Sequence, residues 1–446
     1  MLKFLSALAL LLAPAVAQAQ LSAPERQAVA TIERETDRHI ALLERLVHQN
    51  SGTLNFPGVR AVADMLRPEF EAIGMQVRWV DQAEAGRAGH FIATNTAMRR
   101  RDGRNPPKHI LLIAHLDTVF EPSSPFQRFE RNGDRATGPG VGDDKGGIVV
   151  ILAALRGLRE AGLLRGIDVT VVLTGDEERI GTPISVARRE LIAAGRAADY
   201  ALEYEGLARD DGRDFGTVAR RSSTNWTLTT TGRTGHSSGI FNPSLGYGAI
   251  YEMARILDEW RRTLIEPNLT FNVGVVGGGT PAAVDESGVT VTASGKTNIV
   301  AETAIARGDI RTLSPEQEQR ARAAMQAVVA QHLPHTSAEL VFADNGYPPM
   351  APTEGNRALL GRLNAVNRDL GFPEMPEFDP ARRGAGEDVV LDVDRLERAK
   401  VKRLREQIAT LRMRGRARPF VTHLPDGDDG QTAAHREDAA VDHTIG

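Results

Sequence analysis

Histidine and acidic side chains recur along this chain just after apolar segments or on a turn that leads into one. They are His115, Asp117, Asp143, Asp144, Glu177, Glu178 and Glu205. Imidazole nitrogen and carboxylate oxygen are ligands of divalent metal ions, and a carboxylate held beside such an ion can act as a general base. Because the chain has no cysteine, any metal must be bound by histidine and carboxylate groups. The residue types therefore indicate metal-assisted hydrolysis.

The stretch GPGVGDDKGG, residues 138–147, lies at the centre of this pattern. Glycine lets the backbone turn tightly and approach a ligand closely. The apolar run at 148–155 predicts a buried helix that starts just after the two aspartates. A plain alternative is a surface turn whose aspartates cap that helix. The acids and histidines on both sides of the turn favour a pocket instead.

The elements that must position these residues are strands alternating with helices. Strands are expected at 75–80, 109–114, 167–174 and 199–204, and helices at 23–49, 61–73, after residue 147 and at 183–194. This alternation predicts an α/β domain with a mostly parallel sheet, because continuous apolar strands are buried on both faces. The carboxyl ends of such strands line one crevice. Six of these ionisable groups, all but Asp144, would repel one another there without a cation. Histidine nitrogen and carboxylate oxygen without thiolate favour zinc, or less often cobalt or manganese.

The pattern changes from about residue 220. The segment 224–231 alternates like a half-exposed strand, and a helix at 244–264, strands at 270–276, 288–293 and 303–312, and a helix at 315–332 follow. We expect a separate α+β domain of the β-α-β-β-α-β type, with an antiparallel sheet, inserted at 220–332. A strand at 338–343 and a helix at 356–370 are expected to return to the catalytic domain, which comprises 20–219 and 333–386.

Composition and charge narrow the class of protein. The 446 residues are 41% hydrophobic and 25% charged, which is typical of a globular protein of two or three domains. The net charge of -4 argues against a nucleic-acid-binding protein. A lysine followed by an apolar run and a small-x-small pattern predicts a signal peptide at 1–19. We therefore expect a secreted, periplasmic protein with no membrane association after cleavage.

Four segments together resemble the dizinc aminoacylase and glutamate carboxypeptidase-like metallopeptidases, relatives of the succinyl-diaminopimelate desuccinylases. They read HLDTV, GVGDDKGG, TGDEERIG and YALEYEG, in the order that this family shows. The resemblance runs from about residue 23 to residue 386. It implies a zinc-exopeptidase catalytic domain with an inserted lid or dimerisation domain. It also implies two Zn²⁺ ions per chain, with Co²⁺ or Mn²⁺ possible, and a homodimer.

The resemblance implies a metal-binding role for four residues. Asp143 matches the carboxylate that bridges two zinc ions, which need a shared anion at a separation of about 3.5–4 Å. His115 matches a ligand of one zinc and Glu178 a ligand of the other, while Glu205 completes the site of His115. Asp144, next to the bridge, is expected to face solvent.

Two further acids have expected catalytic roles. Asp117 is placed to orient the His115 imidazole through its other nitrogen, with a plain turn acid as the alternative. Glu177 precedes a metal ligand, so we expect its side chain to act as general base toward the zinc-bound water or hydroxide and then to protonate the leaving nitrogen. In the alternative, Glu177 is solvated and Asp176 takes this role.

Three residues of the inserted domain match substrate-binding positions of the family. His236, in the stretch GRTGHSSG, matches a histidine that reaches across a dimer to the partner's active site and helps to stabilise the oxyanion. Asn298 and Arg311 match positions that touch the substrate, and Arg311 would clamp a free carboxylate. The alternatives are an ordinary loop histidine and a surface arginine at a strand end.

The resemblance ends after Glu387. Residues 395–418 are strongly basic and 426–442 are acidic and polar, with no apolar run. The family's final metal-binding histidine has only His435 as a weak candidate here. The atypical tail at 387–446 is either a divergent replacement or the product of a shifted reading frame.

We thus expect a secreted, dizinc, carboxypeptidase-like exopeptidase that cleaves an amide bond next to a free carboxylate. Peptides or N-acyl amino acids are the expected substrates. The alternatives are an N-acyl amino acid amidohydrolase or deacylase, and a non-catalytic relative impaired by its C-terminal tail.

Overall fold

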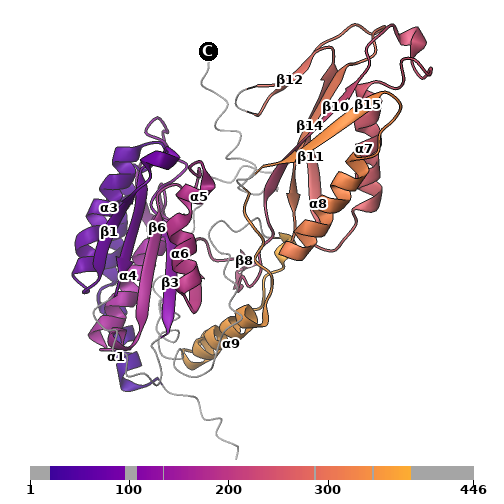
Figure 1. Ribbon diagram of the computed structural model, residues 1–446. Helices are drawn as coiled ribbons and strands as arrows, with labels where there is room; N and C mark the ends of the chain where they lie inside the picture. The colour runs from indigo at the N-terminus through magenta and orange to yellow at the C-terminus, as the bar shows by residue number, and fades with distance from the viewer. Residues whose placement is uncertain (1–20, 96–107, 134, 286–287, 344–345, 383–446) are drawn as a thin grey trace, which may run out of the picture.

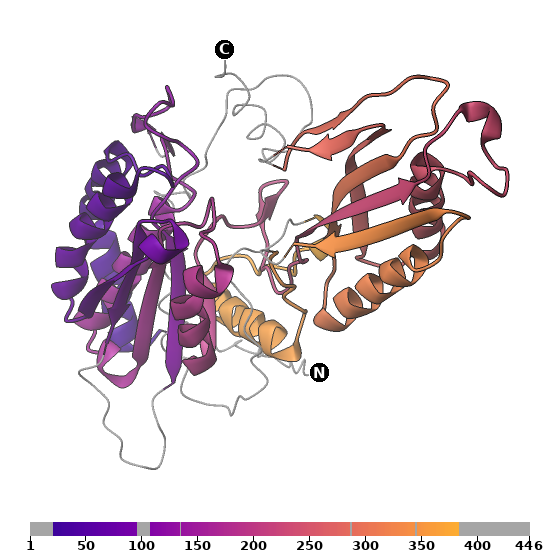
Figure 2. The same ribbon diagram turned by 45° about the horizontal axis from the view of Figure 1, so that its top comes forward.

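The structure, a computed structural model, describes residues 21–95, 108–133, 135–285, 288–343 and 346–382. These residues form two domains that extend side by side from a shared connection (Figures 1 and 2). Within these ranges, no helix combines the length and apolar content that crossing a bilayer requires. The predicted signal peptide, the tail at 387–446 and His435 lie outside the described residues.

The first domain is built on a sheet with strand order β1-β2-β6-β3-β7. Its strands are β1 (Gln76–Asp81), β2 (Gly89–Thr94), β3 (His109–His115), β6 (Asp168–Thr174) and β7 (Tyr200–Glu203). β3 is parallel to β6 and β7, whereas β2 is antiparallel to both β1 and β6. Every strand except β2 therefore runs in the same direction, which confirms the mostly parallel sheet. β2 was not predicted.

Helices cover both faces of this sheet. They are α1 (Ala23–Arg34), α2 (Thr36–His48), α3 (Phe56–Glu71), α4 (Lys145–Glu160), α5 (Ile184–Ala187) and α6 (Arg189–Ala197). Side chains of α2, α3 and α4 pack on Ile110, Leu112 and Ala114 of β3, while Leu111 and Ile113 face the cluster that contains α6. Burial on both faces explains why β3 is apolar from Ile110 to Ala114.

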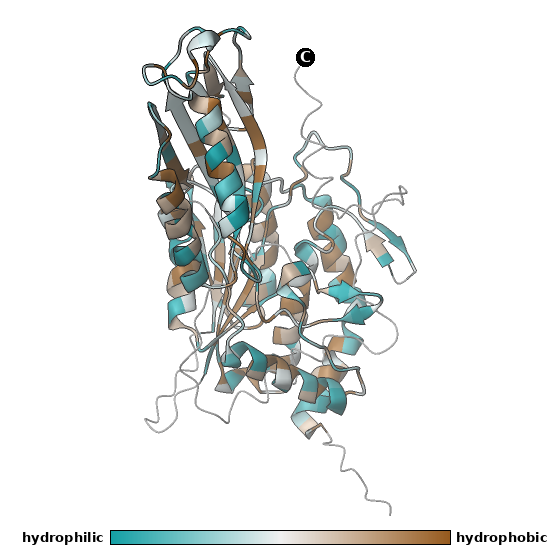
Figure 3. Ribbon diagram, turned by 90° about the vertical axis from the view of Figure 1, so that its right-hand side faces the viewer, coloured by the Kyte–Doolittle hydropathy of each residue, from teal (hydrophilic) through white to brown (hydrophobic). Residues whose placement is uncertain are grey.

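The second domain has an antiparallel sheet with strand order β11-β14-β10-β15. Its elements are β10 (Thr224–Gly232), α7 (Ala249–Thr263), β11 (Thr270–Gly279), β12 (Ala282–Val284), β13 (Val291–Ala293), β14 (Thr303–Arg311), α8 (Pro315–Val329) and β15 (Thr336–Phe342). α7 and α8 pack on one face of the sheet, where Trp226 and Trp260 meet edge to face at 5.3 Å. Figure 3 shows hydrophobic and hydrophilic turns alternating along these helices, as expected for helices with one buried face.

The predicted boundary of the inserted domain at residue 332 is wrong. β15 pairs with β10 from Trp226↔Phe342 to Gly232↔Thr336, so it belongs to the second domain and supplies its last strand. Only the helix α9 (Glu354–Asp369) returns to the first domain, where Leu359 packs against the main core. The expected helix at 23–49 is also two helices, because α1 ends and α2 begins at Glu35.

The two chain crossings between the domains pair with each other. Arg220 and Met350 exchange two backbone hydrogen bonds of 3.0 and 2.9 Å, and Ser223 and Tyr347 exchange two of 2.9 and 2.8 Å. This short ribbon connects the domains next to the carboxyl end of β7. The remaining short elements are η1 (Ala83–Ala85), β4 (Glu130–Asn132), β5 (Arg135–Thr137), η2 (Leu164–Gly166), β8 (Arg209–Asp210), β9 (Arg213–Asp214), η3 (Ser237–Gly239) and η4 (Pro380–Arg382).

Candidate metal centre

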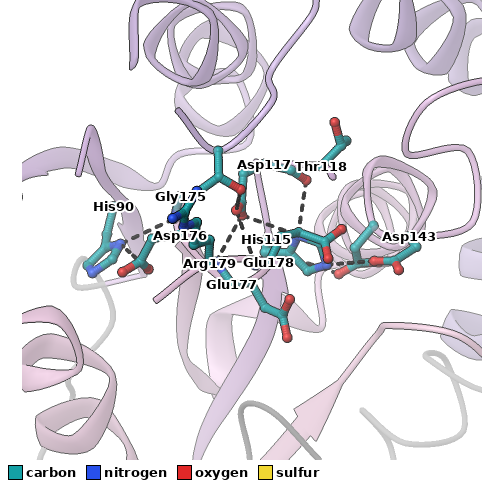
Figure 4. Close-up of polar contacts among 12 residues, drawn as sticks. His90, His115, Asp117, Thr118, Asp143, Gly175, Asp176, Glu177, Glu178 and Arg179 are labelled. Atoms are coloured by element: carbon teal, nitrogen blue, oxygen red, sulfur yellow. Dashed lines mark hydrogen bonds and ion pairs between the residues drawn. The ribbon is translucent and has the colours of Figure 1, made fainter. Parts of the chain in front are cut away.

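His115 ends β3 and is buried, with 1% of its side chain exposed. Its Nε2 lies 2.7 Å from Asp143 Oδ1, and its Nδ1 lies 3.1 Å from the Asp117 carbonyl oxygen and 3.4 Å from Asp117 Oδ1 (Figure 4). Burial works against protonation of the ring, but the contacts with the two aspartates outweigh it and hold the pKa of His115 well above its usual value. The site is thus arranged to stabilise positive charge between His115 and Asp143.

Asp117 is fully buried and contacts more than the imidazole. Its Oδ1 accepts a hydrogen bond from Glu177 N at 3.0 Å, and its Oδ2 accepts from Glu178 N at 3.2 Å and from Thr53 Oγ1 at 2.7 Å. The predicted role of orienting His115 agrees with the 3.4 Å approach of Asp117 Oδ1 to Nδ1. The same carboxylate also holds the backbone of both acids that follow β6.

Glu177 and Glu178 lie on the loop between β6 and α5. The alignment of His115 with Thr174 in the parallel pair β3–β6 brings this loop beside the segment that follows β3. One ligand atom each from His115, Glu177 and Glu178 lies within 4.8 Å of the others, and Figure 4 shows Glu178 beside His115. Within the described parts of the chain, this is the one group of three or more such residues with that spacing.

Asp143 and Asp144 differ in exposure, but in the opposite sense to the prediction. Asp143, although it contacts His115, has 51% of its side chain exposed, whereas Asp144 is fully buried. Asp144 turns inward because it precedes α4 directly, and its Oδ2 accepts a hydrogen bond from His115 N at 3.3 Å. Burial, together with the nearby acids Glu203, Glu205 and Asp143, raises the pKa of Asp144 well above its usual value, although His115 opposes this. The expectation that Asp144 faces solvent is wrong.

Two buried carboxylate oxygens of this cluster indicate that a cation fits here. Among the described residues, neither Glu177 Oε1 nor Asp144 Oδ1 has a hydrogen-bond partner. Buried polar atoms in proteins are almost always paired, so orphaned acidic oxygens beside an imidazole call for an ion. Imidazole and carboxylate ligands without thiolate suit zinc, and manganese or cobalt less often.

Glu205 lies on the turn after β7 and is half-buried. Its backbone N donates a 2.5 Å hydrogen bond to Glu203 Oε1, while Glu203 Oε2 lies 3.6 Å from Arg220 Nη1. Arg220 is only 8% exposed at its side chain and belongs to the ribbon between the domains. The turn that carries Glu205 is therefore held by an ion pair with the connection. Glu203 was not predicted, because a single acid inside a strand matches no recognisable functional motif.

The three predicted substrate-binding residues lie at opposite ends of the second domain. His236 is exposed, with its Nδ1 2.8 Å from Ser238 Oγ, and its backbone pairs with Ile299, next to Asn298. Arg311 ends β14 beside the connection between the domains, with its Nε 2.9 Å from Asp309 Oδ2. β14 spans nine residues, so its ends are about 26 Å apart. The structure does not bring His236 and Asn298 together with Arg311.

Lys145 is a buried residue of the site that was not predicted from the sequence. It is the first residue of α4, is fully buried, and donates from Nζ to the Gln49 carbonyl oxygen at 2.9 Å. Burial lowers the pKa of Lys145 to about 7, with Asp117 opposing the shift. Its place directly after the two aspartates, inside the conspicuous stretch at 138–147, was the signal that could have identified it.

Comparison with known protein families agrees with this geometry. The profile of peptidase family M20/M25/M40 matches residues 111–391, which is more than half of the chain and includes every predicted site residue except His435. The chain belongs to peptidase family M20/M25/M40. It is therefore a metallopeptidase or amidohydrolase, and the resemblance inferred from the four segments is confirmed.

Similar proteins support a metal-dependent amide hydrolase. Carboxypeptidase G2 of a Pseudomonas species is 28% identical over 341 residues, which cover 74% of this chain and 74% of that protein. The succinyl-diaminopimelate desuccinylase of Gluconobacter oxydans is 26% identical over 249 residues, which cover 54% of this chain and 61% of that protein.

Solved structures support the M20 fold. The aminopeptidase PepT of Bacillus cereus superimposes with a TM-score of 0.57 at 20% identity, covering 79% of this chain and 86% of that one. A tripeptidase of Staphylococcus aureus gives 0.56 at 19% identity, covering 87% and 97%. The α/β catalytic domain with an inserted α+β domain is thus confirmed.

Proposed function

We propose that this M20 protein is an exported, dizinc, carboxypeptidase-like hydrolase that cleaves an amide bond next to a free carboxylate. The observation that carries the proposal is the convergence of His115, Glu177 and Glu178, whose ligand atoms lie within 4.8 Å of one another at the end of two parallel strands. Beyond metal-dependent amide hydrolysis, the proposal specifies a mechanism and a substrate class.

His115, Asp143, Glu178 and Glu205 are the residues that would hold the metal. Asp143 would be shared between two ions, His115 and Glu205 would serve one of them, and Glu178 the other. Once bound, zinc makes water more acidic and polarises the amide carbonyl. The fit rests on the donor set and on the unpaired buried carboxylate oxygens.

Glu177 is the proposed general base. It is 3% exposed, and the hydrogen bond from its backbone N to Asp117 fixes the point from which its side chain starts. A carboxylate with an unpaired oxygen in a buried site can accept a proton from the attacking water and return it to the leaving nitrogen. Asp176 is not available for this step, because both of its carboxylate oxygens are hydrogen-bonded within the protein.

Substitution of Glu177 tests the assignment of the base. Glu177→Gln is expected to lower kcat by about 10²- to 10⁴-fold, because the amide cannot accept the proton, while metal content stays near the parent value. Glu160→Gln, the same change at the exposed end of α4, serves as the control. Metal is counted by plasma mass spectrometry, with two zinc ions per chain expected. Full activity of Glu177→Gln would overturn the assignment.

A deacylase is the alternative within the same chemistry. It is favoured by the matches to succinyl-diaminopimelate desuccinylases, whose name describes removal of a succinyl group. Hydrolysis of dipeptides compared with N-succinyl and N-acetyl amino acids separates the two. A preference for peptides with a free C-terminus supports the carboxypeptidase-like function, and a preference for small acyl groups supports the deacylase.

A homodimer would explain the position of His236. Its imidazole is exposed about one strand length from Arg311, so it suits contact with a second chain better than contact with its own centre. Aromatic side chains of Phe241, Tyr247 and Tyr251 cluster nearby, with Phe241 52% and Tyr251 49% exposed. Mixing two inactive variants, His236→Ala and Glu177→Gln, is expected to restore part of the activity, because some mixed dimers then hold one intact site. No recovery in a verified mixed dimer would contradict the proposal.

Export is the last part of the proposal. It depends on the lysine and apolar run at the start of the sequence, which predict a cleaved signal peptide at 1–19. Cell fractionation and N-terminal sequencing of the recovered protein test this. A cytoplasmic protein that begins at residue 1 would contradict it.

A further inference from the structure

The loop between β6 and α5 has no regular structure, yet side chains, most of them buried, hold its backbone. Asp117 accepts from the two amides that carry the acid pair, as described above. Further contacts hold the same loop: His90 contacts Gly175, Asp176 contacts Gly181, and Arg87 donates to two carbonyl oxygens. Because buried backbone groups must be paired, these contacts set the path of the loop.

His90 is the fully buried residue that joins the start of this loop to α5. Its Nε2 lies 2.7 Å from the Ala187 carbonyl oxygen, and its Nδ1 lies 3.2 Å from Gly175 N. A carbonyl can only accept a hydrogen bond, so Nε2 carries the proton. A backbone N–H can only donate, so Nδ1 is unprotonated. The contacts therefore require a neutral ring with one defined tautomer. Burial lowers the pKa of His90, which agrees with a neutral ring.

Asp176 completes this buried group. Its Oδ1 accepts from Arg188 Nη1 at 2.6 Å, and its Oδ2 accepts from Gly181 N at 2.8 Å. Asp176 Oδ1 lies 3.9 Å from His90 Nδ1, which is too far for a hydrogen bond. Figure 4 shows Asp176 pointing toward His90, away from the side on which Glu178 meets His115. The loop thus directs one acid into the protein and leaves the next two for the metal centre.

Gly175 is the first residue of the loop, and its position sets the direction in which the loop leaves β6. It follows the last residue of β6 and precedes Glu177 by two positions. A Cβ added at Gly175 would lie 2.2 Å from the Gly89 carbonyl oxygen, so the backbone here already touches β2, the strand that carries His90. A small shift of the Gly175 amide would therefore move the Glu177 carboxylate relative to the metal centre. A misplacement of about 1 Å in a catalytic group can cost about 10²-fold in rate.

We propose that His90 is a positioning residue for the catalytic acid pair, and that it acts through the hydrogen bond from Gly175 N to its Nδ1. The inference rests on the proposed role of Glu177 as general base. The contacts of His90 are with Gly175, Ala187 and Asp176, none of which is a proposed metal ligand, and the contact with Ala187 fastens the ring to α5.

Two substitutions separate the two contacts of His90. In His90→Asn the side-chain oxygen takes the place of Nδ1, so the bond from Gly175 N is kept and the bond to Ala187 is lost. In His90→Gln the terminal amide takes the place of Nε2, so the bond to the Ala187 carbonyl oxygen is kept and the bond from Gly175 N is lost. We expect His90→Asn to keep kcat within about threefold of the parent, whereas His90→Gln loses about 10- to 100-fold in kcat with KM and metal content little changed.

The comparison of the two variants is decisive in either direction. Equal losses in both, or a larger loss in His90→Asn, would show that the contact with Gly175 does not position the acids and would overturn the inference. Unfolding midpoints of both variants are measured alongside, because a merely structural role would lower the midpoint without a selective loss of kcat in the folded His90→Gln protein.

A measurement on the unchanged protein keeps the inference testable if either variant fails to fold. Nitrogen chemical shifts of ¹⁵N-labelled histidine report which ring nitrogen carries the proton. A buried, neutral His90 protonated at Nε2 is expected, and protonation at Nδ1 would overturn the inference. Glu177→Gln in the parent is the separate test of the proposed function. If that variant is inactive while the two His90 variants behave alike, only the positioning role fails.

Discussion

Replacing Asp117 by asparagine removes the acceptor shared by both sides of the metal centre. The wild-type carboxylate accepts from Glu177 N, Glu178 N and Thr53 Oγ1 and faces His115 Nδ1. Asparagine has the same shape but only one acceptor oxygen, so its amide group must point at one of the two backbone N–H groups. Either orientation leaves one backbone donor without a partner, the buried amide of Glu177 or the half-buried amide of Glu178.

The magnitude follows from that single unsatisfied group. A buried donor left unpaired costs about 1–3 kcal/mol of folding free energy. The loop that carries Glu177 and Glu178 would also lose the anion that anchors it, and such changes around a metal site typically cost about 10- to 100-fold in metal affinity or activity. We therefore expect Asp117→Asn to fold with reduced stability, to bind zinc more weakly and to lose kcat.

Three assays check this expectation. Urea unfolding measures the free energy of unfolding, competition with a chromogenic chelator measures zinc affinity, and hydrolysis of the best substrate from the amide panel gives kcat and KM. Asp64→Asn, the same change at an exposed position of α3, controls for the loss of one negative charge. Parent-like values of stability, zinc affinity and kcat in Asp117→Asn would refute the reasoning.

Two further changes follow from groups outside the reaction itself. Burial, with Arg156 and Arg38, lowers the pKa of His39 from its usual 6.5 to about 4. Below pH 6.5 the unfolded chain binds a proton that folded His39 does not, so stability falls as the pH drops toward 4. Between about pH 7 and pH 5 this amounts to about 2 kcal/mol, and urea unfolding should show that His39→Gln lacks this part of the slope; an unchanged slope argues against it. Arg220→Gln removes the cation beside Glu203, and we expect about tenfold weaker zinc binding in chelator competition, whereas the exposed Arg382→Gln has no effect. Equal zinc affinity in both arginine variants would contradict the coupling.

The convergence of the site could be predicted because it follows from strand ends. β3 and β6 are parallel with His115 opposite Thr174, so residues that follow the two strands must meet. The apolar strands and the acids after them were both visible in the sequence, because β3 is buried from Ile110 onward and β6 from Val171 onward. The pairing of Asp117 with the amides of Glu177 and Glu178 is a consequence of this register.

Contacts between residues far apart in sequence could not be predicted in the same way. β15 has the composition of a strand, but nothing local shows that it pairs with β10 rather than with the first sheet. The inward turn of Asp144 depends on how α4 starts beneath His115, since two adjacent aspartates look alike in sequence. His90 belongs to a strand that was not predicted, so its contact with Gly175 had no signal.

The central claim is that the end of β3 and β6 is a metal centre that hydrolyses amides. Anomalous scattering at the zinc absorption edge, from crystals of protein that has been shown to be active, tests it most directly. The account predicts two neighbouring peaks beside His115, Asp143 and Glu178. Active protein without an anomalous peak at this cluster would contradict it.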